Sequence, residues 1–189
     1  MKKMSMFLVA FMVMTMSAVQ AQWKADPAHT EVGFKITHLG ISTISGTFNE
    51  FEATITSSKP DFSDAQITMS ANISSIDTRV EARDNHLKSA DFFDAQKHPK
   101  LTFKSTSIKS LGMNKYKVSG NMTMHGVTKP VELEMSFHGT TTNPQSKKTT
   151  AGFTFKGHIN RADFNVGSGF PPPMIGEEVK IYAHAEFTK

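Results

Sequence analysis

Apolar and polar residues alternate along most of the chain with a period of two, the pattern of strands that bury one face. The alternation returns in eight segments, most of them joined by short turns. The predicted inward positions are Val32, Phe34, Ile36, Ile44, Gly46, Phe48, Phe51, Ala53, Ile55, Ala65, Ile67, Met69, Ala71, Ile73, Leu101, Phe103, Ile108, Tyr116, Val118, Gly120, Met122, Met124, Val131, Leu133, Met135, Phe137, Phe153, Phe155, Gly157, Ile159, Val179, Ile181, Ala183, Ala185 and Phe187. In the second segment the inward parity changes between Phe48 and Phe51, which predicts a β-bulge at Asn49–Glu50.

The short turns predict strands that are mainly antiparallel. Several segments reach about ten residues, longer than the usual strand of about 5–6. Eight long strands, each apolar on one face, can close on themselves and so remove their exposed edges. The sequence therefore predicts an all-β fold, an eight-stranded antiparallel β-barrel, with a two-sheet sandwich as the alternative architecture.

One long stretch, residues 73–103, interrupts the strand pattern. Its apolar residues follow an irregular helical spacing, and its polar residues are rich in helix-start signals. Asp77 or Thr78 is expected to act as the N-cap of a helix, with Glu81 completing a capping box. We interpret the stretch as a short helical lid inserted between the third and fourth strands.

The first residues have the features of a secretory signal peptide. A pair of lysines precedes an apolar run, Met6–Met16, which is shorter than the roughly 20 residues of a membrane span. Small residues at and before Ala21 predict cleavage after that residue. We therefore expect a signal peptide over residues 1–21 and one soluble periplasmic domain over residues 22–189.

Charge and cysteine content limit the functions that this domain can have. Without the two leader lysines the mature chain carries 19 basic and 17 acidic residues, so its charge is nearly balanced and gives no argument for a nucleic-acid partner. The chain has no cysteine, so its stability cannot come from disulfides.

The inward face mixes small residues, such as Gly46, Gly120 and Gly157, with phenylalanine and methionine. The small residues could leave a cavity for a long apolar molecule, with adaptable methionine walls. Alternatively, the large side chains fill the barrel, which then serves as a module that binds a partner such as a membrane protein. The pattern alone leaves both interpretations open.

A second irregular stretch, Arg161–Gly176, is rich in glycine and proline, which rules out a regular strand or helix. Its apolar residues, including Phe164 and Phe170, could form a rim that closes over a ligand. They could equally be aromatic side chains of a surface loop packed on the barrel end.

Three charged or titratable residues are candidates for contacting a ligand head group or for pinning the lid: Asp84, His86 and Arg161. Arg161 follows the inward Ile159 by two positions, so its side chain is expected to point inward. We expect a structural ion pair between Arg161 and either Asp84 or Asp163. The alternative is that Arg161 receives an anionic head group.

Catalytic and metal motifs are weak in this sequence. The eight histidines are scattered, without HxH or HExxH spacing, and no GxSxG is present. No metal or cofactor is therefore expected, and a zinc site assembled in space is left open. An enzyme that acts on a lipid head group at the barrel mouth, through histidine and aspartate of the lid, is the alternative to a binding protein.

Short segments along essentially the whole mature chain resemble the YceI-like family of bacterial periplasmic lipid-binding proteins. They are Trp23, Asp26–His29, Val32–Phe34, His38–Gly40, Gly46–Phe48, Ser75–Thr78, Arg83–Asp94, His98–Pro99, Phe103, Gly120–Val131, Arg161–Phe164 and Ile175–Val179. Their number and order make the resemblance specific. Asn165 stands where the family pattern leads us to expect glycine, so we expect the mouth of the barrel to differ in geometry.

The resemblance implies a lipocalin-like barrel whose apolar channel holds one amphiphile, such as a polyisoprenoid, an isoprenoid quinone or a fatty-acid amide. It further implies storage, carriage or sequestration of that lipid rather than catalysis, and a homodimer. Combined with the inward pattern, it predicts ligand contacts from Phe34, Ile36, Phe48, Ile67, Met69, Leu87, Phe92, Phe93, Phe103, Met122, Met124, Met135, Phe153, Phe155, Ile159, Phe164, Phe170 and Ile181.

Overall fold

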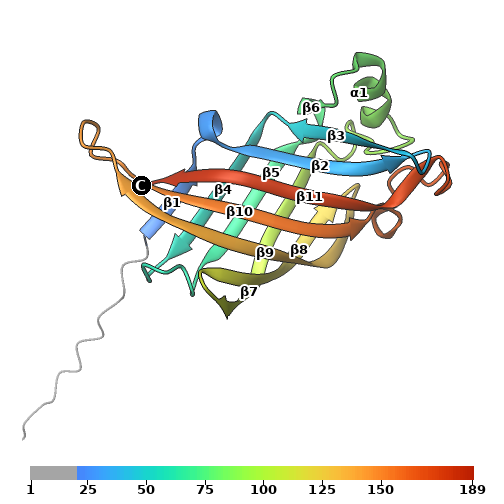
Figure 1. Cartoon of the computed structure of the whole chain (residues 1–189). Coiled ribbons are helices and arrows are strands. Elements are labelled where there is room, and N and C mark those ends of the chain that lie inside the picture. Colours follow the sequence, from blue (N-terminus) through green and yellow to red (C-terminus); the bar gives the residue numbers. More distant parts are fainter. Residues whose placement is uncertain (1–20) are drawn as a thin grey trace, which may run out of the picture.

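The computed structural model describes residues 21–189, which form one elongated barrel (Figure 1). The strands are β1 (Ala21–Ala25), β2 (Glu31–His38), β3 (Ser42–Phe48), β4 (Phe51–Ser57), β5 (Gln66–Asn72), β6 (Ile76–Asp77), β7 (Lys100–Gly112), β8 (Lys115–Met124), β9 (Val127–Thr142), β10 (Thr149–Asn160) and β11 (Ile175–Thr188). The described chain has one α-helix, α1 (Glu81–Lys88), and three short 3-10 turns at Pro27–His29, Ile73–Ser75 and Arg161–Phe164. Apart from Ala21, the predicted signal peptide lies outside the described residues.

All strand pairs are antiparallel, and the barrel closes where β1 pairs with β11 through Lys24↔Thr188 and Ala25↔Phe187. The closed ring runs β1-β4-β5-β7-β8-β9-β10-β11, which confirms the predicted eight-stranded barrel. β2, β3 and β6 extend the sheet beyond β11. β1 was missed by the alternation, although its Trp23 is buried.

The predicted bulge at Asn49–Glu50 is instead a complete interruption between β3 and β4. The Asn49 N–H donates to the Ser75 carbonyl at 3.2 Å, and the Glu50 N–H donates to Ser75 Oγ at 2.9 Å. Ser75 therefore supplies the partners that a continuous ladder would have given these amides. Because the chain bends here, both Phe48 and Phe51 can point inward, although they are three residues apart.

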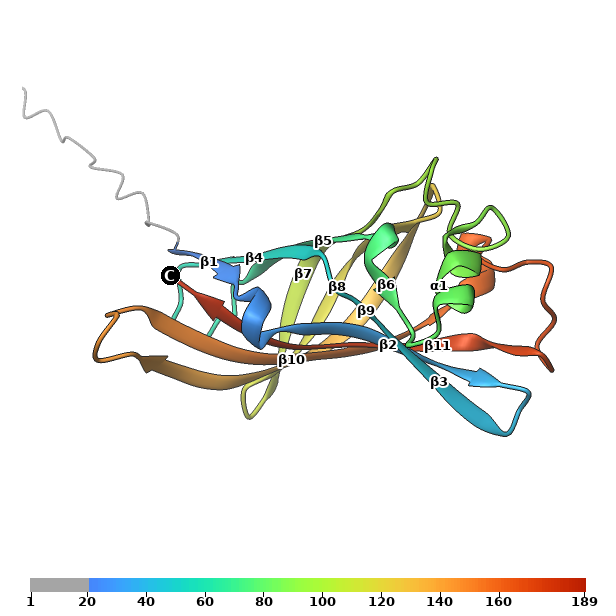
Figure 2. The same cartoon turned by 90° about the horizontal axis from the view of Figure 1, so that it is seen from above.

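The lid, residues 78–99, includes α1 and covers the end of the barrel opposite the C-terminus (Figure 2). The predicted capping box is wrong, because α1 starts after Val80, whose side chain caps nothing. Asp84 instead accepts hydrogen bonds from the Thr78 N–H, at 2.9 Å, and from the Thr78 hydroxyl. Within residues 21–189 no helix has the length and apolar character needed to cross a membrane.

The end of the barrel away from the lid is filled by aromatic side chains. Phe62, from the loop between β4 and β5, is 1% exposed and lies 4.9 Å from the rings of both Phe137 and Phe153, measured between centroids. Trp23 and Phe187 complete this cluster. Dense aromatic packing closes this end, so any ligand must enter from the lid end.

Two of the small inward residues do not leave empty space, which at these positions favours the second of the two interpretations that the pattern left open. A Cβ placed on Gly46 would lie 2.5 Å from Cζ of Phe34, and one on Gly120 would lie 2.4 Å from Cζ of Phe103. A glycine in a strand often marks such a close approach. These glycines are therefore covered by aromatic rings, and enlarging Gly120 would displace Phe103 and disturb the barrel itself.

Candidate functional site

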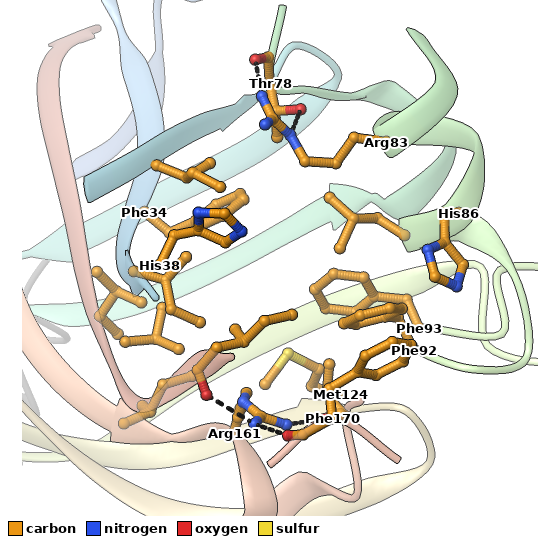
Figure 3. A pocket seen from close by; sticks show the side chains of 18 of the residues that line it. Phe34, His38, Thr78, Arg83, His86, Phe92, Phe93, Met124, Arg161 and Phe170 are labelled. Carbon is orange, nitrogen blue, oxygen red and sulfur yellow. Dashed lines mark hydrogen bonds between the residues drawn. The ribbon is translucent and has the colours of Figure 1, made fainter. Parts of the chain in front are cut away.

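A cavity of about 440 Å³ lies at the lid end of the barrel. Its walls come from the inner faces of β2, β3 and β11, from the lid, and from the mouth loop, which we define as residues 165–174. Figure 3 shows side chains around an open space, with Arg83 at one edge and Arg161 at the opposite edge. The volume is within the range of about 300–1,000 Å³ typical of sites for small organic ligands.

A second cavity of about 110 Å³ lies deeper in the barrel. Phe34, Phe48, Leu101, Ile159 and Ile181 border both cavities, so only side chains separate them. Because these are apolar side chains without hydrogen-bond partners to lose, small rotations can join the two spaces. The interior thus holds two adjoining apolar cavities, which would form one channel if those side chains rotate; we call the two together the channel.

Most residues that the sequence predicted for the channel line one of the two cavities. The wider cavity is lined by Phe34, Ile36, Phe48, His86, Leu87, Phe92, Phe93, Met124, Ile159, Arg161, Phe170 and Ile181. The inner cavity adds Ile67, Met69, Phe103, Met122 and Phe155.

Three predicted wall residues, Met135, Phe153 and Phe164, line neither cavity. They are fully buried in the packed core. Met135 and Phe153 have the correct inward parity, but they lie in the part of the barrel that aromatic side chains fill. Phe164 belongs to the 3-10 turn directly before the mouth loop, where it is buried.

Arg161 is buried, and all five of its N–H groups donate to backbone carbonyls. The acceptors are Val166, Gly167, Phe170, Ile175 and Gly176, at distances of 2.5 to 3.0 Å. An arginine has five such donors, so none is left for a ligand. The predicted ion pair with Asp84 or Asp163 is wrong, because backbone carbonyls take its place, and the full use of the N–H groups argues against the alternative of a head-group contact. Burial lowers the pKa of Arg161 from its ordinary value.

The mouth loop starts at Asn165, whose φ of 58° is in the left-handed region. Its N–H donates to the Ala162 carbonyl at 3.0 Å and ends the 3-10 turn. Asparagine tolerates this conformation better than other non-glycine residues. The departure from the expected glycine is thus compatible with the same turn.

Arg83, which the alternation could not identify, also borders the wider cavity. Its Nε donates to Thr78 Oγ1 at 2.7 Å and its Nη2 donates to the Thr78 carbonyl at 2.6 Å. Within residues 21–189 these bonds engage two of its five N–H groups, which leaves three for a ligand. His38, also missed, borders the same cavity. Alternation of apolar and polar residues identifies only apolar wall positions, so it could not indicate Arg83 or His38. The signal that could have identified them is that both belong to the segments that resemble the family.

His86 lies on α1 at the exposed edge of the cavity. Its Nε2 lies 3.1 Å from Asp91 Oδ2, and its ring packs edge-on against Phe92 and Phe170. Phe92 of the lid stacks on Phe170 of the mouth loop with 4.8 Å between ring centroids. Asp84 is held by Thr78 instead, so the lid gives no Asp84–His86 pair for acid–base chemistry.

Comparison with known proteins gives a consistent result. The model of the YceI-like domain family matches residues 23–187. Protein YceI of Salmonella arizonae is 38% identical over 181 residues, which cover 95% of this chain and 93% of that protein.

Solved structures agree with these matches. The YceI protein of Campylobacter jejuni superposes with a TM-score of 0.74 at 32% identity, over 87% of this chain and 95% of that one. A polyisoprenoid-binding domain from Saccharophagus degradans has the same fold, with a TM-score of 0.65 at 13% identity over 87% of this chain and 97% of that one. By its sequence and by the family model that spans it, the chain belongs to the YceI-like family.

Proposed function

We propose that this protein binds one long-chain apolar lipid, with the tail along the channel and the polar end at the mouth. The observation that carries the proposal is the channel itself, which is apolar, closed at the Phe62 end and polar only near the lid. Burial of each CH₂ group stabilises by about 0.8 kcal/mol, so a tail can bind firmly without specific polar contacts.

The narrow inner cavity limits the shape of the tail. Its 110 Å³ is smaller than a cavity of about 150 Å³ that accommodates one benzene ring. A slender isoprenoid or acyl chain can enter it, particularly since Met69 and Met122 can change rotamer, whereas a fused ring system cannot. The polyisoprenoid-binding description of the Saccharophagus domain supports an isoprenoid tail.

The head group is expected to carry hydrogen-bond acceptors, because the free donors at the mouth belong to Arg83, with His38 and His86 nearby. A prenyl phosphate, an isoprenoid quinone and a fatty-acid amide all meet this requirement. We further propose export to the periplasm and storage or carriage of the lipid there. The apolar lining of both cavities supports binding over catalysis.

Native mass spectrometry of the full chain, purified without detergent, tests the proposal, followed by extraction and identification of bound lipid. We expect one lipid per chain, with a prenyl or acyl tail. Protein that carries no lipid and takes up none from added prenyl quinone or prenyl phosphate would contradict it. Fractionation of the producing cells tests the proposed location. Light scattering of the purified protein tests the expected homodimer.

A matched pair of variants separates channel binding from surface binding. Ile36→Trp fills the wider cavity, so it is expected to reduce bound lipid at least tenfold while the barrel stays folded. Leu111→Trp adds the same side chain at an exposed position on β7 and is expected to bind lipid normally. Equal lipid content in both variants would show that the lipid is not in the channel.

A further inference from the structure

Three side chains that commonly bind metals meet where the lid crosses the turn between β8 and β9. Asp94 and His98 come from the lid, and His125 comes from the turn. One ligand atom from each residue lies within 4.8 Å of the other two, and all three residues are half-buried.

The backbone brings these side chains together. The His98 N–H donates to the Asp94 carbonyl at 2.8 Å, so the two side chains lie one turn apart on the same face. His125 and Gly126 form a two-residue hairpin turn, with φ values of 51° and 74°. A Cβ on Gly126 would lie 2.6 Å from Cε1 of His98, so glycine is needed here for the His98 ring to approach the turn.

The contacts of His125 and Asp94 suit metal binding. His125 Nδ1 lies 3.3 Å from the Phe164 carbonyl. Since a carbonyl can only accept, Nδ1 carries the proton and Nε2 keeps a free lone pair, the arrangement usual for histidine ligands of metals. Asp94 offers a carboxylate oxygen, whose present partner is the Lys97 ammonium at 2.9 Å.

We propose that Asp94, His98 and His125 bind one divalent transition-metal ion, with Zn²⁺ as the best fit and water as the fourth ligand. Two imidazoles and a carboxylate suit zinc, whereas Mg²⁺ and Ca²⁺ prefer oxygen ligands alone. Zinc bonds of about 2.0–2.2 Å place ligand atoms roughly 3.4 Å apart, so small side-chain rotations complete the site. The Lys97 ammonium leaves Asp94 in the process, and because Lys97 is largely exposed this ion pair is weak.

The position of the site gives the metal a role in closing the barrel. It would join the lid to a turn whose neighbour, Met124, lines the wider cavity. The Phe164 carbonyl behind His125 lies directly before the mouth loop. Bound metal would thus hold the lid on the barrel and slow exchange of the lipid, a role that rests on the proposed function.

Calorimetric titration of the EDTA-treated full chain with ZnCl₂ tests the site. We expect one saturable equivalent, and with CoCl₂ the visible absorption of tetrahedral Co²⁺. His98→Ala and His125→Ala are each expected to weaken zinc binding by roughly tenfold or more, while His138→Ala on β9 leaves it unchanged. Zinc affinity that is unaffected by both lid-site variants, or the absence of saturable binding, would overturn the site.

A variant that is expected to bind zinc more tightly complements the alanine variants, because a folding defect can weaken zinc binding but cannot strengthen it. Lys97→Met removes the competing ammonium from Asp94, so zinc binding is expected to strengthen severalfold. Weaker zinc binding by folded Lys97→Met protein would show that the Lys97 ammonium does not compete with the metal for Asp94, which overturns the proposed ligand set.

Lipid release measured with and without zinc tests the closing role. We expect zinc to slow release from the natural protein but not from His98→Ala. Zinc binding without an effect on release would keep the site and reject the closing role. Protein that takes up no lipid would reject the proposed function, while the zinc titration would still decide the site.

Discussion

Arg161 donates its five N–H groups to carbonyls of the mouth loop and of the start of β11, without an acidic partner. A buried charge is costly unless its donors are fully hydrogen-bonded, and here five carbonyl dipoles supply that compensation. The sequence could predict that Arg161 points inward and pins a loop. It could not predict the partners, because every residue has a carbonyl and no side chain marks the ones that turn toward Arg161.

Arg161→Met is expected to lower the free energy of unfolding by about 3 kcal/mol or more, because several buried carbonyls lose their donors. Arg161→Lys should recover part of this loss, since lysine offers three donors. Urea unfolding measures both. Asp163→Ala is the control for the rejected ion pair and should leave stability unchanged; a loss comparable to that of Arg161→Met would restore that ion pair as an explanation.

Asp64 gives the stability an acid dependence. Burial raises the pKa of this carboxyl, but hydrogen bonds from Ser57, Ser58 and Lys59 outweigh it and hold the pKa well below its ordinary value of 3.8. Since the folded-state pKa is depressed, the stabilisation is complete above the unfolded-state value and is lost as the pH falls below it. Urea midpoints should therefore show Asp64→Asn less stable at pH 7, with the difference shrinking below about pH 4. A difference that is constant between pH 7 and pH 2.5 would contradict this.

At the scale of elements, period-two alternation predicted eight segments that match β2, β5, β7, β8, β9, β10, β11 and the pair β3 and β4, because each buries one face of a regular ladder. It missed β1, where Trp23 stands among polar residues and gives no repeated pattern. The start of α1 was also wrong, because Asp84 is engaged by Thr78 through a contact that depends on the folded lid. Strands follow from local pattern, whereas caps and bends depend on partners distant in the chain, as Ser75 shows for the bend after β3.

Phe170 of the mouth loop contacts two aromatic rings of the lid, stacking on Phe92 and packing edge-on against His86. Such a pair contributes about 1 kcal/mol beyond the area it buries, so Phe170→Ala should increase lid opening about fivefold. Hydrogen exchange across residues 81–98, read by mass spectrometry, should accelerate accordingly. Leu111→Ala, at an exposed site on β7, is the control, and equal exchange in both variants would show that the stack does not hold the lid.

At the scale of the whole molecule, the barrel divides into a packed end around Phe62 and a hollow end under the lid. The inward parity of Met135 and Phe153 was predicted correctly, yet parity does not tell which part of a barrel is filled. That depends on Phe62, which reaches the interior from a loop with no periodic pattern. The residues that face the interior could thus be predicted, but the length of barrel that remains hollow could not.

This division predicts unequal costs for truncation. Phe62→Ala removes a ring from dense packing and should lower the free energy of unfolding by about 3–5 kcal/mol. Ile36→Ala enlarges a space that already exists, so its cost should be near 1 kcal/mol, mainly lost burial. Urea unfolding of lipid-free protein measures both. Equal costs would mean that the wider cavity is filled in solution.

The arrangement around Arg161 also affects how this protein can evolve. Carbonyl groups persist whatever side chain is substituted, so Ser168, Gly169 and Pro171–Met174 can vary while the loop keeps its three hydrogen bonds to Arg161. Gly167 is an exception, because its φ of 64° and its closeness to Phe92 require glycine. Lineages can therefore change the chemistry of the entrance without rebuilding its scaffold, and a library randomised at these positions offers a direct route to altered ligand selectivity.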